Sequence, residues 1–224
     1  MFTGLIEEIG QVTKILKKSH GMEIAVKGNS VTRKINVGDS IAVNGVCLTV
    51  TSFKKNIFNA DIMYETVQRT GLKRIKKGER VNLEKSLTVE TFLGGHLVMG
   101  DVDCEAEILS ITPKGIAKVY EFRLNQNDME NMKYIVEKGR VTIDGASLTI
   151  INVNDRKCEF SVSLIPHSLK NIILGEKNKG DFVNIETDLL GKYVEKILKF
   201  DTSDNEKNIP KSELTFEFLE ENGF

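Results

Sequence analysis

The hydrophobic and polar positions of this chain alternate at a period of two over short segments, which is the pattern of half-buried β-strands. In the first half such runs cover residues 10–16, 21–26, 40–53, 57–63 and 80–83. Asn44 and Gly45 interrupt the third run, and an Asn-Gly pair between two strand-like runs is a strong hairpin signal. The pattern predicts strands joined by short turns, which is typical of a small antiparallel barrel.

The second half of the chain repeats the first. The segment VNGVCLTV at residues 43–50 returns as IDGASLTI at 143–150, and KGERVNLE at 77–84 returns as KGDFVNIE at 179–186. More loosely, MFTGLI at 1–6 matches LVMGDV at 97–102. Strand-like runs at 105–110, 117–124, 140–153, 158–164 and 182–186 follow the same plan. We therefore expect a duplicated domain with two similar pockets.

Three segments have helical rather than strand character: residues 65–72, residues 128–138 and the stretch after residue 188. In the last of these, apolar residues recur at helical spacing and form a narrow stripe, made of Leu190, Tyr193, Val194, Ile197 and Leu198. The stripe packs either against the chain's own barrels or against the same helix of other subunits. We favour the second arrangement, which predicts a homo-oligomer.

Composition excludes several classes of function. The net charge of −1 offers no general attraction for nucleic acid or an anionic membrane. The three histidines are isolated, the three cysteines lie far apart, and no Gly-rich phosphate loop of the Walker or Rossmann pattern is present, so the sequence shows neither a metal-site pattern nor a nucleotide-binding pattern. An odd number of separated cysteines fits free thiols, and the start of the chain shows no signal-type stretch; both favour the cytoplasm.

The two repeats differ at matched positions that are able to carry chemistry. Cys47 matches Ser147, Glu65 matches His167 and Thr66 matches Ser168, whereas Thr49 and Thr149 keep the same residue type. Each also has a structural explanation: a lone cysteine is often a small core residue, threonine suits strands, and loops drift after duplication. Taken singly, these residues identify no function.

Together, the motifs resemble a known family. MFTGLIEE at 1–8, NGVCLTV at 44–50, GGHLVMG at 94–100 and DGASLT at 144–149 resemble riboflavin synthase, and VNIE at 183–186 and EENGF at 220–224 extend the resemblance over essentially the whole chain. The resemblance implies an all-β fold of two tandem six-stranded antiparallel Greek-key barrels related by internal duplication, plus a C-terminal α-helix. We expect lumazine-binding barrels at 1–95 and 96–187, and an oligomerisation helix and tail at 188–224.

The resemblance also implies an activity. Each barrel of the family binds one 6,7-dimethyl-8-ribityllumazine, and a four-carbon unit passes between the two molecules to give riboflavin and 5-amino-6-ribitylaminouracil without a cofactor or metal. It further implies a homotrimer held by the C-terminal helices, with each site between the N-terminal barrel of one subunit and the C-terminal barrel of its neighbour. Whether such trimers associate with lumazine synthase stays open.

Carried over position by position, the resemblance predicts substrate-binding residues at the ends of both barrels. For the first barrel these are Gly4, Leu5, Ile6, Cys47, Leu48, Thr49, Asp61, Ile62, Met63, Tyr64, Glu65 and Thr66. For the second barrel they are Gly100, Asp101, Val102, Lys138, Ser147, Leu148, Thr149, Ser163, Leu164, Ile165, Pro166, His167 and Ser168. The candidates for catalysis are Cys47, Ser147, Asp188 and Asp101.

Asp101 departs from the family pattern, because many members carry histidine at this position. An ionised carboxylate does not donate a proton, and its ordinary pKa of about 3.9 lies well below the value of about 6.5 for histidine. Asp101 therefore replaces that imidazole only if burial raises its pKa, or another residue takes over.

Two rival interpretations remain. Lumazine proteins resemble the synthase but bind one lumazine or flavin as a fluorescent antenna, having lost the binding residues of the second barrel. The second rival interpretation is an oligomeric scaffold with vestigial pockets. Because Lys138, Ser147, Thr149 and the segment 165–168 are all present here, we favour the enzyme.

Overall fold

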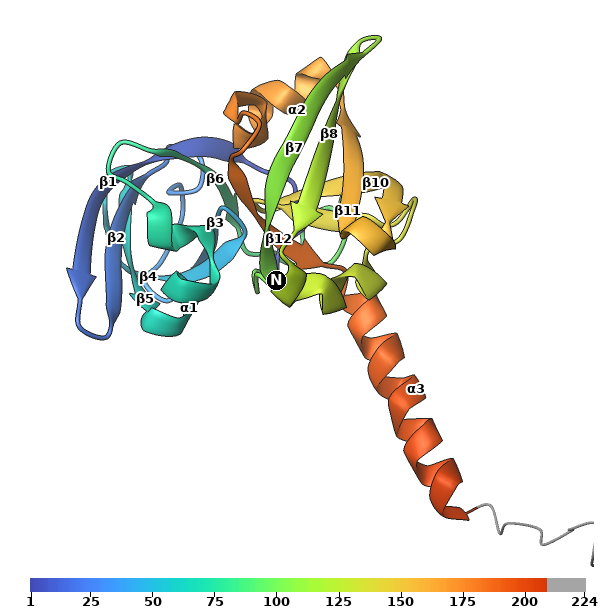
Figure 1. Cartoon of the computed structure of the whole chain (residues 1–224). Helices are drawn as coiled ribbons and strands as arrows, with labels where there is room; N and C mark the ends of the chain where they lie inside the picture. Colours follow the sequence, from blue (N-terminus) through green and yellow to red (C-terminus); the bar gives the residue numbers. More distant parts are fainter. Residues whose placement is uncertain (209–224) are drawn as a thin grey trace, which may run out of the picture. The chain divides into compact units, whose positions relative to one another are not determined.

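A computed structural model describes the backbone of residues 1–208 and the side chains of residues 1–200. Its first half forms one closed antiparallel barrel and its second half another (Figure 1). The first contains β1 (Glu8–Lys18), β2 (Gly21–Lys27), β3 (Ser40–Val43), β4 (Val46–Lys54), β5 (Ile57–Met63) and β6 (Arg80–Lys85). The second contains β7 (Cys104–Lys114), β8 (Ala117–Leu124), β9 (Arg140–Ile143), β10 (Ala146–Asn154), β11 (Glu159–Leu164) and β12 (Phe182–Thr187).

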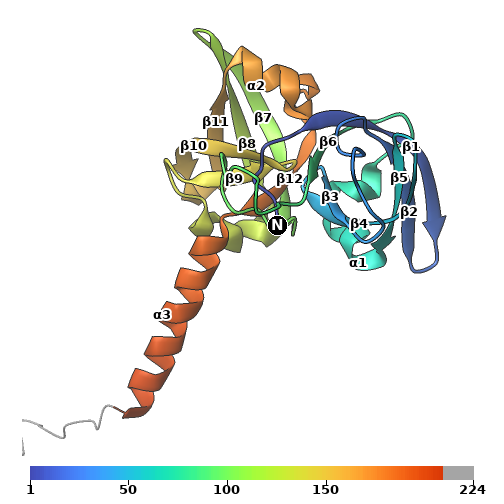
Figure 2. The same ribbon diagram turned by 180° about the vertical axis from the view of Figure 1, so that it is seen from behind.

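The two barrels have the same topology. The first closes in the order β1-β2-β5-β4-β3-β6, and the second closes in the equivalent order when β7 is set against β1. Figure 2 shows the same two barrels from behind. The expected fold class of two six-stranded barrels related by duplication is confirmed.

The hairpins expected at the Asn-Gly and Asp-Gly pairs are also confirmed. Asn44 and Gly45 join β3 to β4 with φ angles of 48° and 79°, and Asp144 and Gly145 join β9 to β10 with φ angles of 44° and 85°. Two successive positive φ angles characterise the type I′ turn, whose twist matches that of the flanking strands. Asn, Asp and Gly are the residues that tolerate this conformation at least cost.

The short helices agree less well with expectation. The helix expected at 65–72 is α1 (Tyr64–Arg69), and the extended residue Thr70 separates it from a 3₁₀ turn, η1 (Gly71–Arg74). The helix expected at 128–138 is wrong, because this region is the 3₁₀ segment η2 (Gln126–Tyr134). Met132 and Ile135 are buried three residues apart, and that spacing suits three residues per turn. The remaining elements are η3 (Asp155–Lys157), α2 (Pro166–Asn171) and η4 (Ile173–Glu176).

The chain divides into a compact unit of Met1–Leu189, which contains both barrels, and a second unit of Leu190–Phe224. The helix α3 (Leu189–Asn208) occupies most of the described part of the second unit, and an i,i+4 ion pair joins its Glu195 to Lys199. Within the expected apolar stripe, Tyr193, Val194 and Ile197 are exposed. None of the described helices is long and apolar enough to cross a membrane. The rest of the expected tail lies outside the described residues.

Two matched asparagines connect the barrels. Asn82 of β6 donates from its side chain to the backbone oxygen of Asp144, 2.8 Å away, and accepts from the backbone N–H of Ile173 at 2.8 Å. Asn184 of β12 makes the symmetric contacts, donating to the oxygen of Asn44 at 2.8 Å and accepting from the N–H of Gly71 at 2.7 Å. Both side chains are buried. Each asparagine therefore satisfies two backbone groups of the opposite barrel.

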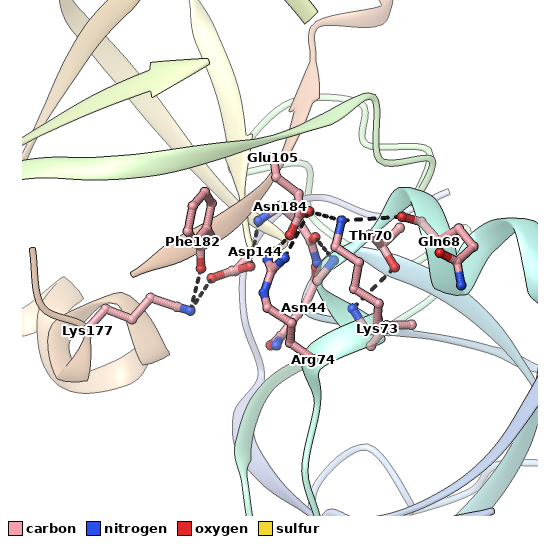
Figure 3. A network of polar contacts seen from close by, with 12 residues as sticks. Asn44, Gln68, Thr70, Lys73, Arg74, Glu105, Asp144, Lys177, Phe182 and Asn184 are labelled. Carbon is pink, nitrogen blue, oxygen red and sulfur yellow. Dashed lines mark hydrogen bonds and ion pairs between the residues drawn. The ribbon is translucent and has the colours of Figure 1, made fainter. Parts of the chain in front are cut away.

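Charged side chains surround the Asn184 end of this contact (Figure 3). Glu105 of β7 is almost fully buried and forms ion pairs with Lys73, at 2.5 Å, and with Arg74 of η1 in the first barrel. Asp144 is also buried, and its Oδ2 lies 3.6 Å from Nζ of Lys177. Burial raises the pKa of Asp144, and Lys177 opposes that shift. The contact between the barrels is therefore polar as well as buried.

Replacing Asn82 with Ala is expected to lower the free energy of unfolding by roughly 2–4 kcal/mol, because two buried backbone groups lose their partner. Urea unfolding followed by circular dichroism measures this change. The matched control is Asn56→Ala, since within the described residues the Asn56 side chain bonds only to the exposed Asn29; it is expected to change the value by less than about 0.5 kcal/mol. Equal losses in both variants would show that the connection between the barrels contributes little.

Candidate functional site

The segments that precede the two barrels meet side by side. Phe2 and Val98 form an isolated antiparallel bridge, with Phe2 N–H donating to Val98 O at 2.7 Å and Val98 N–H donating to Phe2 O at 3.1 Å. Both residues are buried against Ala42. The loose match between residues 1–6 and 97–102 therefore corresponds to a pair of equivalent segments.

Each segment runs onto the barrel of the other repeat. The backbone N–H of Cys47 in the first barrel donates to Gly100 O at 2.9 Å, and that of Ser147 in the second donates to Gly4 O at 2.8 Å. Val102 packs against the core of the first barrel, and Ile6 packs against the core of the second. These contacts place residues 4–6 beside Ser147 and residues 100–102 beside Cys47, whereas the expected grouping put residues 4–6 in the first pocket and 100–102 in the second. Which of these residues bind a ligand stays a prediction. The bridge at Phe2 and Val98 directs each segment across to the opposite barrel.

Glycine is required where the segments touch the strands. Gly4 and Gly100 have φ angles of 74° and 83°, in the left-handed region. A Cβ atom on Gly4 would lie 2.5 Å from Cβ of Ser147, and one on Gly100 would lie 2.6 Å from Cβ of Cys47. Both the backbone angle and the close approach therefore exclude a side chain here.

Two buried glutamates form hydrogen bonds with the segments 1–6 and 97–102. Glu84 of β6 accepts hydrogen bonds from the N–H of Thr3 at 2.7 Å, the hydroxyl of Thr3 at 2.6 Å and the N–H of Gly4 at 3.0 Å. At the matched position of β12, Glu186 accepts from the N–H groups of Met99 and Gly100 at 2.6 and 3.0 Å. Burial raises the pKa of Glu84, although its three hydrogen bonds oppose the shift. These hydrogen bonds fix the position of each segment relative to the strand that carries the glutamate.

The other predicted binding residues gather at the same barrel ends. β4 and β5 run antiparallel with Val50 opposite Ala60, so residues 61–66 follow the strand towards Cys47. β10 and β11 repeat this arrangement with Ile150 opposite Val162, which brings residues 163–168 towards Ser147. In each barrel the alternating side chains of these strands divide between the core and the solvent.

Burial separates the predicted residues into three groups. The apolar side chains that face the core are Leu48, Ile62 and Leu164, with Leu148 half-buried against it. Cys47, Ser147, Thr66 and Ser168 are half-buried. The exposed residues are Leu5, Thr49, Asp61, Met63, Tyr64, Glu65, Asp101, Lys138, Thr149, Ser163, Ile165, Pro166 and His167. The half-buried thiol and hydroxyls are therefore the polar groups at the margin between core and solvent.

Two of the predicted catalytic residues are carboxylates. Asp101 is exposed, so the burial that would let it replace a histidine is not present. Asp188 is half-buried directly after β12; burial lowers the pKa of the His96 imidazole, and the charge of Asp188 opposes that shift. Of the two, Asp188 is therefore the carboxylate placed near the second barrel's polar groups.

The sequence reasoning left His96 and Thr142 out of the site. His96 Nδ1 lies 2.7 Å from the Ser147 hydroxyl, and its Nε2 lies 3.3 Å from the hydroxyl of Thr142. A signal was present in the two glycines before His96: a Cβ on Gly95 would lie 2.0 Å from the backbone oxygen of Thr3. Only glycine lets the chain pass there and turn the imidazole towards Ser147.

Metal-binding chemistry finds no support in the described part of the chain, where no cluster of three or more His, Cys, Asp or Glu side chains could hold an ion. Cys47, Cys104 and Cys158 are free thiols. Burial raises the pKa of Cys104 above its usual range, which makes that thiol a poor nucleophile. The groups able to carry chemistry beside the matched residues are therefore the thiol of Cys47 in the first barrel, and the hydroxyl of Ser147 with the imidazole of His96 in the second.

Two equivalent barrels with such sites define a tandem-repeat binding protein, and the lumazine binding domain family matches residues 3–86 and 99–188. The chain is 43% identical to riboflavin synthase of Actinobacillus pleuropneumoniae and 42% identical to that of Bacillus subtilis, in each case over the full length of both proteins. The chain belongs to the riboflavin synthase family. Its fold also matches LumP complexed with riboflavin, with a TM-score of 0.73, 24% identity, and coverage of 84% of this chain and 99% of that one.

Replacing Gly100 with Ala is expected to destabilise the protein more than replacing Gly78 with Ala. Both glycines have positive φ, at 83° and 90°, so both variants carry a backbone strain of about 1–2 kcal/mol. Only Gly100 has neighbours that a Cβ would meet, which adds about 1–3 kcal/mol from overpacking. Urea unfolding compares the two. Equal destabilisation would contradict the tight approach of residues 97–102 to Cys47.

Proposed function

We propose that the protein acts as a riboflavin synthase in the final step of riboflavin biosynthesis. It converts two molecules of 6,7-dimethyl-8-ribityllumazine into riboflavin and 5-amino-6-(D-ribitylamino)uracil by transfer of a four-carbon unit. The observation that carries this conclusion is identity of 41–43% to three curated riboflavin synthases over the whole chain. The duplicated barrel end supports it, because the reaction joins two copies of one substrate.

Each barrel end takes one lumazine, and the groups that receive it come from both repeats. In the first site these are residues 47–49, 61–66 and 100–102; in the second they are residues 147–149, 163–168 and 4–6, together with Lys138. Carbonyl and N–H groups pair with the polar edge of the ring system, while hydroxyls and exposed polar side chains receive the ribityl chain. The family-model matches at 3–86 and 99–188 support barrel domains at 1–95 and 96–187, followed by the helix and tail at 188–224.

Catalysis then depends chiefly on holding two flat heterocycles face to face. Orientation of two reactants contributes up to about 7–11 kcal/mol in favourable cases. Cys47 and Ser147 are the half-buried thiol and hydroxyl that assist addition to the ring and removal of a methyl proton. Asp188 contributes to the second site through its charge, which acts on the imidazole of His96. Asp101 follows Gly100, whose carbonyl oxygen accepts from the N–H of Cys47, and is the candidate for catalysis in the first site beside that thiol. No cofactor or metal takes part.

The active enzyme is a homotrimer held by α3, with each site completed by the barrel of a neighbouring subunit. Tyr193, Val194 and Ile197 support this arrangement, because three exposed apolar side chains at helical spacing form a face for other copies of the helix. The protein works in the cytoplasm, where its three thiols stay reduced.

A direct assay tests the function. Purified protein is incubated with 6,7-dimethyl-8-ribityllumazine and no cofactor, and riboflavin is followed by absorbance. One mole of riboflavin for every two moles of lumazine consumed is the expected result. Tight binding without turnover, at one lumazine per chain, would contradict the enzyme and indicate an antenna-type binding protein. A protein that neither binds lumazine nor forms riboflavin would contradict both and indicate a scaffold with vestigial pockets.

The oligomer is tested by a double substitution, Val194→Asp with Ile197→Asp. Two charges in the apolar face of α3 are expected to convert the trimer into monomers and to lower riboflavin formation at least tenfold, because the site needs two subunits. Light scattering coupled to gel filtration measures the mass. Lys196→Gln, on the same helix, is the matched control and is expected to stay trimeric. A fully active monomer would contradict the site between subunits.

A further inference from the structure

The crossing segment 100–102 contacts the first barrel, but both of its ends are held on β12 of the second barrel. At one end the N–H of Gly100 donates to the carboxylate of Glu186 at 3.0 Å. At the other end the N–H of Asp103 donates to a backbone oxygen of β12 at 2.9 Å. Between them, Gly100 O accepts from the N–H of Cys47 at 2.9 Å. The position of this segment on the first barrel therefore depends on both attachments to β12.

The side chain of Asp103 makes a further attachment to β12. Its Oδ2 accepts from the backbone N–H of Thr187 and from the hydroxyl of Thr187, each at 2.8 Å. Thr187 is only 2% exposed, and Asp103 is half-buried. Hydrogen bonds to a carboxylate are stronger than those between neutral groups, and they are stronger still where water is excluded. Asp103 therefore fixes the end of the crossing segment against the last residue of β12.

The matched attachment in the first repeat is made by an exposed pair. Glu7 follows residues 4–6 as Asp103 follows residues 100–102, and its Oε1 accepts from the backbone N–H of Lys85 at 2.8 Å. Lys85 occupies the position of Thr187 but has no hydroxyl, and its Nζ lies 3.5 Å from Oε2 of Glu7. Glu7 is exposed, and an exposed ion pair contributes little. The segment that serves the first site is therefore the one whose end is fixed by a buried hydroxyl.

We propose that Asp103 is a positioning residue of the first site, which holds residues 100–102 in the orientation that receives the lumazine of the first barrel. This inference rests on the proposed function. Asp103 acts through the crossing segment, by its contact with Thr187, rather than by touching the reacting atoms. Without this contact the segment shifts relative to Cys47, and the ring bound beside it shifts as well. A misplacement of about 1 Å costs roughly 10²-fold in rate when two reactants must be aligned.

The test compares Asp103→Ala with Asp181→Ala in the full-length protein. Asp181 is a matched control because it is also half-buried and also accepts from a backbone N–H, that of Asn178 at 2.7 Å, in the turn at the opposite end of β12. Amide hydrogen exchange without ligand, followed by mass spectrometry, reports on the crossing segment. The N–H groups of Gly100 and Cys47 are expected to exchange about 10–100-fold faster in D103A, and at the wild-type rate in D181A.

Steady-state kinetics of riboflavin formation gives the second readout. The kcat of D103A is expected to fall about 10–100-fold. Its KM is expected to change less than about threefold, because residues 47–49 and 61–66 still bind the lumazine. D181A is expected to retain wild-type kcat and KM. A purely structural role would lower the urea midpoint of D103A and leave the kcat of the folded enzyme unchanged.

Substitution of Thr187 examines the other side of the same contact with a smaller change. Thr187→Val keeps the shape of the side chain and removes the hydroxyl, so kcat is expected to fall about three- to tenfold. Thr187→Ser keeps the hydroxyl and is expected to retain wild-type kcat and amide exchange. Should D103A fail to fold, this pair of variants decides.

The inference is overturned if D103A matches D181A in amide exchange or in kcat, or if T187V and T187S have the same kcat. The proposed function fails separately, if wild-type protein binds lumazine and forms no riboflavin. For such a protein, a changed absorption spectrum of bound lumazine in D103A, with the wild-type spectrum in D181A, would still support the orienting role. Identical spectra in the two variants would overturn it.

Discussion

The reciprocal contact of Asn82 and Asn184 is the constraint on which the rest of the structure depends. Each side chain satisfies one N–H and one carbonyl of the opposite barrel. A buried backbone group without a partner costs about 1–3 kcal/mol, so the barrels cannot separate or rotate without exposing or orphaning these groups. The turns at Gly45 and Gly145 approach closely beside them, and a Cβ on either would lie 2.8 Å from the backbone nitrogen of the other. Duplication and close packing thus hold the two barrels together in one compact unit.

This fixed pairing explains why the site residues come from both repeats. With the barrels held together, the segments 1–6 and 97–102 bridge to each other and then lie on the opposite barrel. Glu84 and Glu186 fix the position of these segments through hydrogen bonds. Because Gly4 and Gly100 have no side chain, the first approaches Ser147 closely and the second approaches Cys47 closely. The same crossing delivers His96 to Ser147. The asymmetry between the two sites therefore comes from the side chains that the crossing segments and the barrel strands carry, not from a difference in fold.

Much of the fold could be predicted because its signals are local. Alternation at a period of two identifies the strands, and the pairs Asn44-Gly45 and Asp144-Gly145 identify hairpins. Neither signal depends on distant residues. The helix expected at 128–138 failed because Met132 and Ile135 are three residues apart, a spacing that fits both 3₁₀ and α-helical geometry. The crossing of residues 1–6 could not be predicted, since it depends on the packing of two barrels. His96 was missed for the same reason: it is isolated along the chain and finds its partners, Ser147 and Thr142, only in the folded structure.

The exchange of segments between the two sites is tested most directly by a crystal structure of the full chain with a non-reacting lumazine analogue bound. The expected result is one analogue at each barrel end. The ring in the first barrel should lie within hydrogen-bond distance of residues 47–49 and 100–102, and the ring in the second within that distance of residues 147–149 and 4–6. An analogue that contacts residues 4–6 in the first barrel and 100–102 in the second, or that binds away from both barrel ends, would contradict this account.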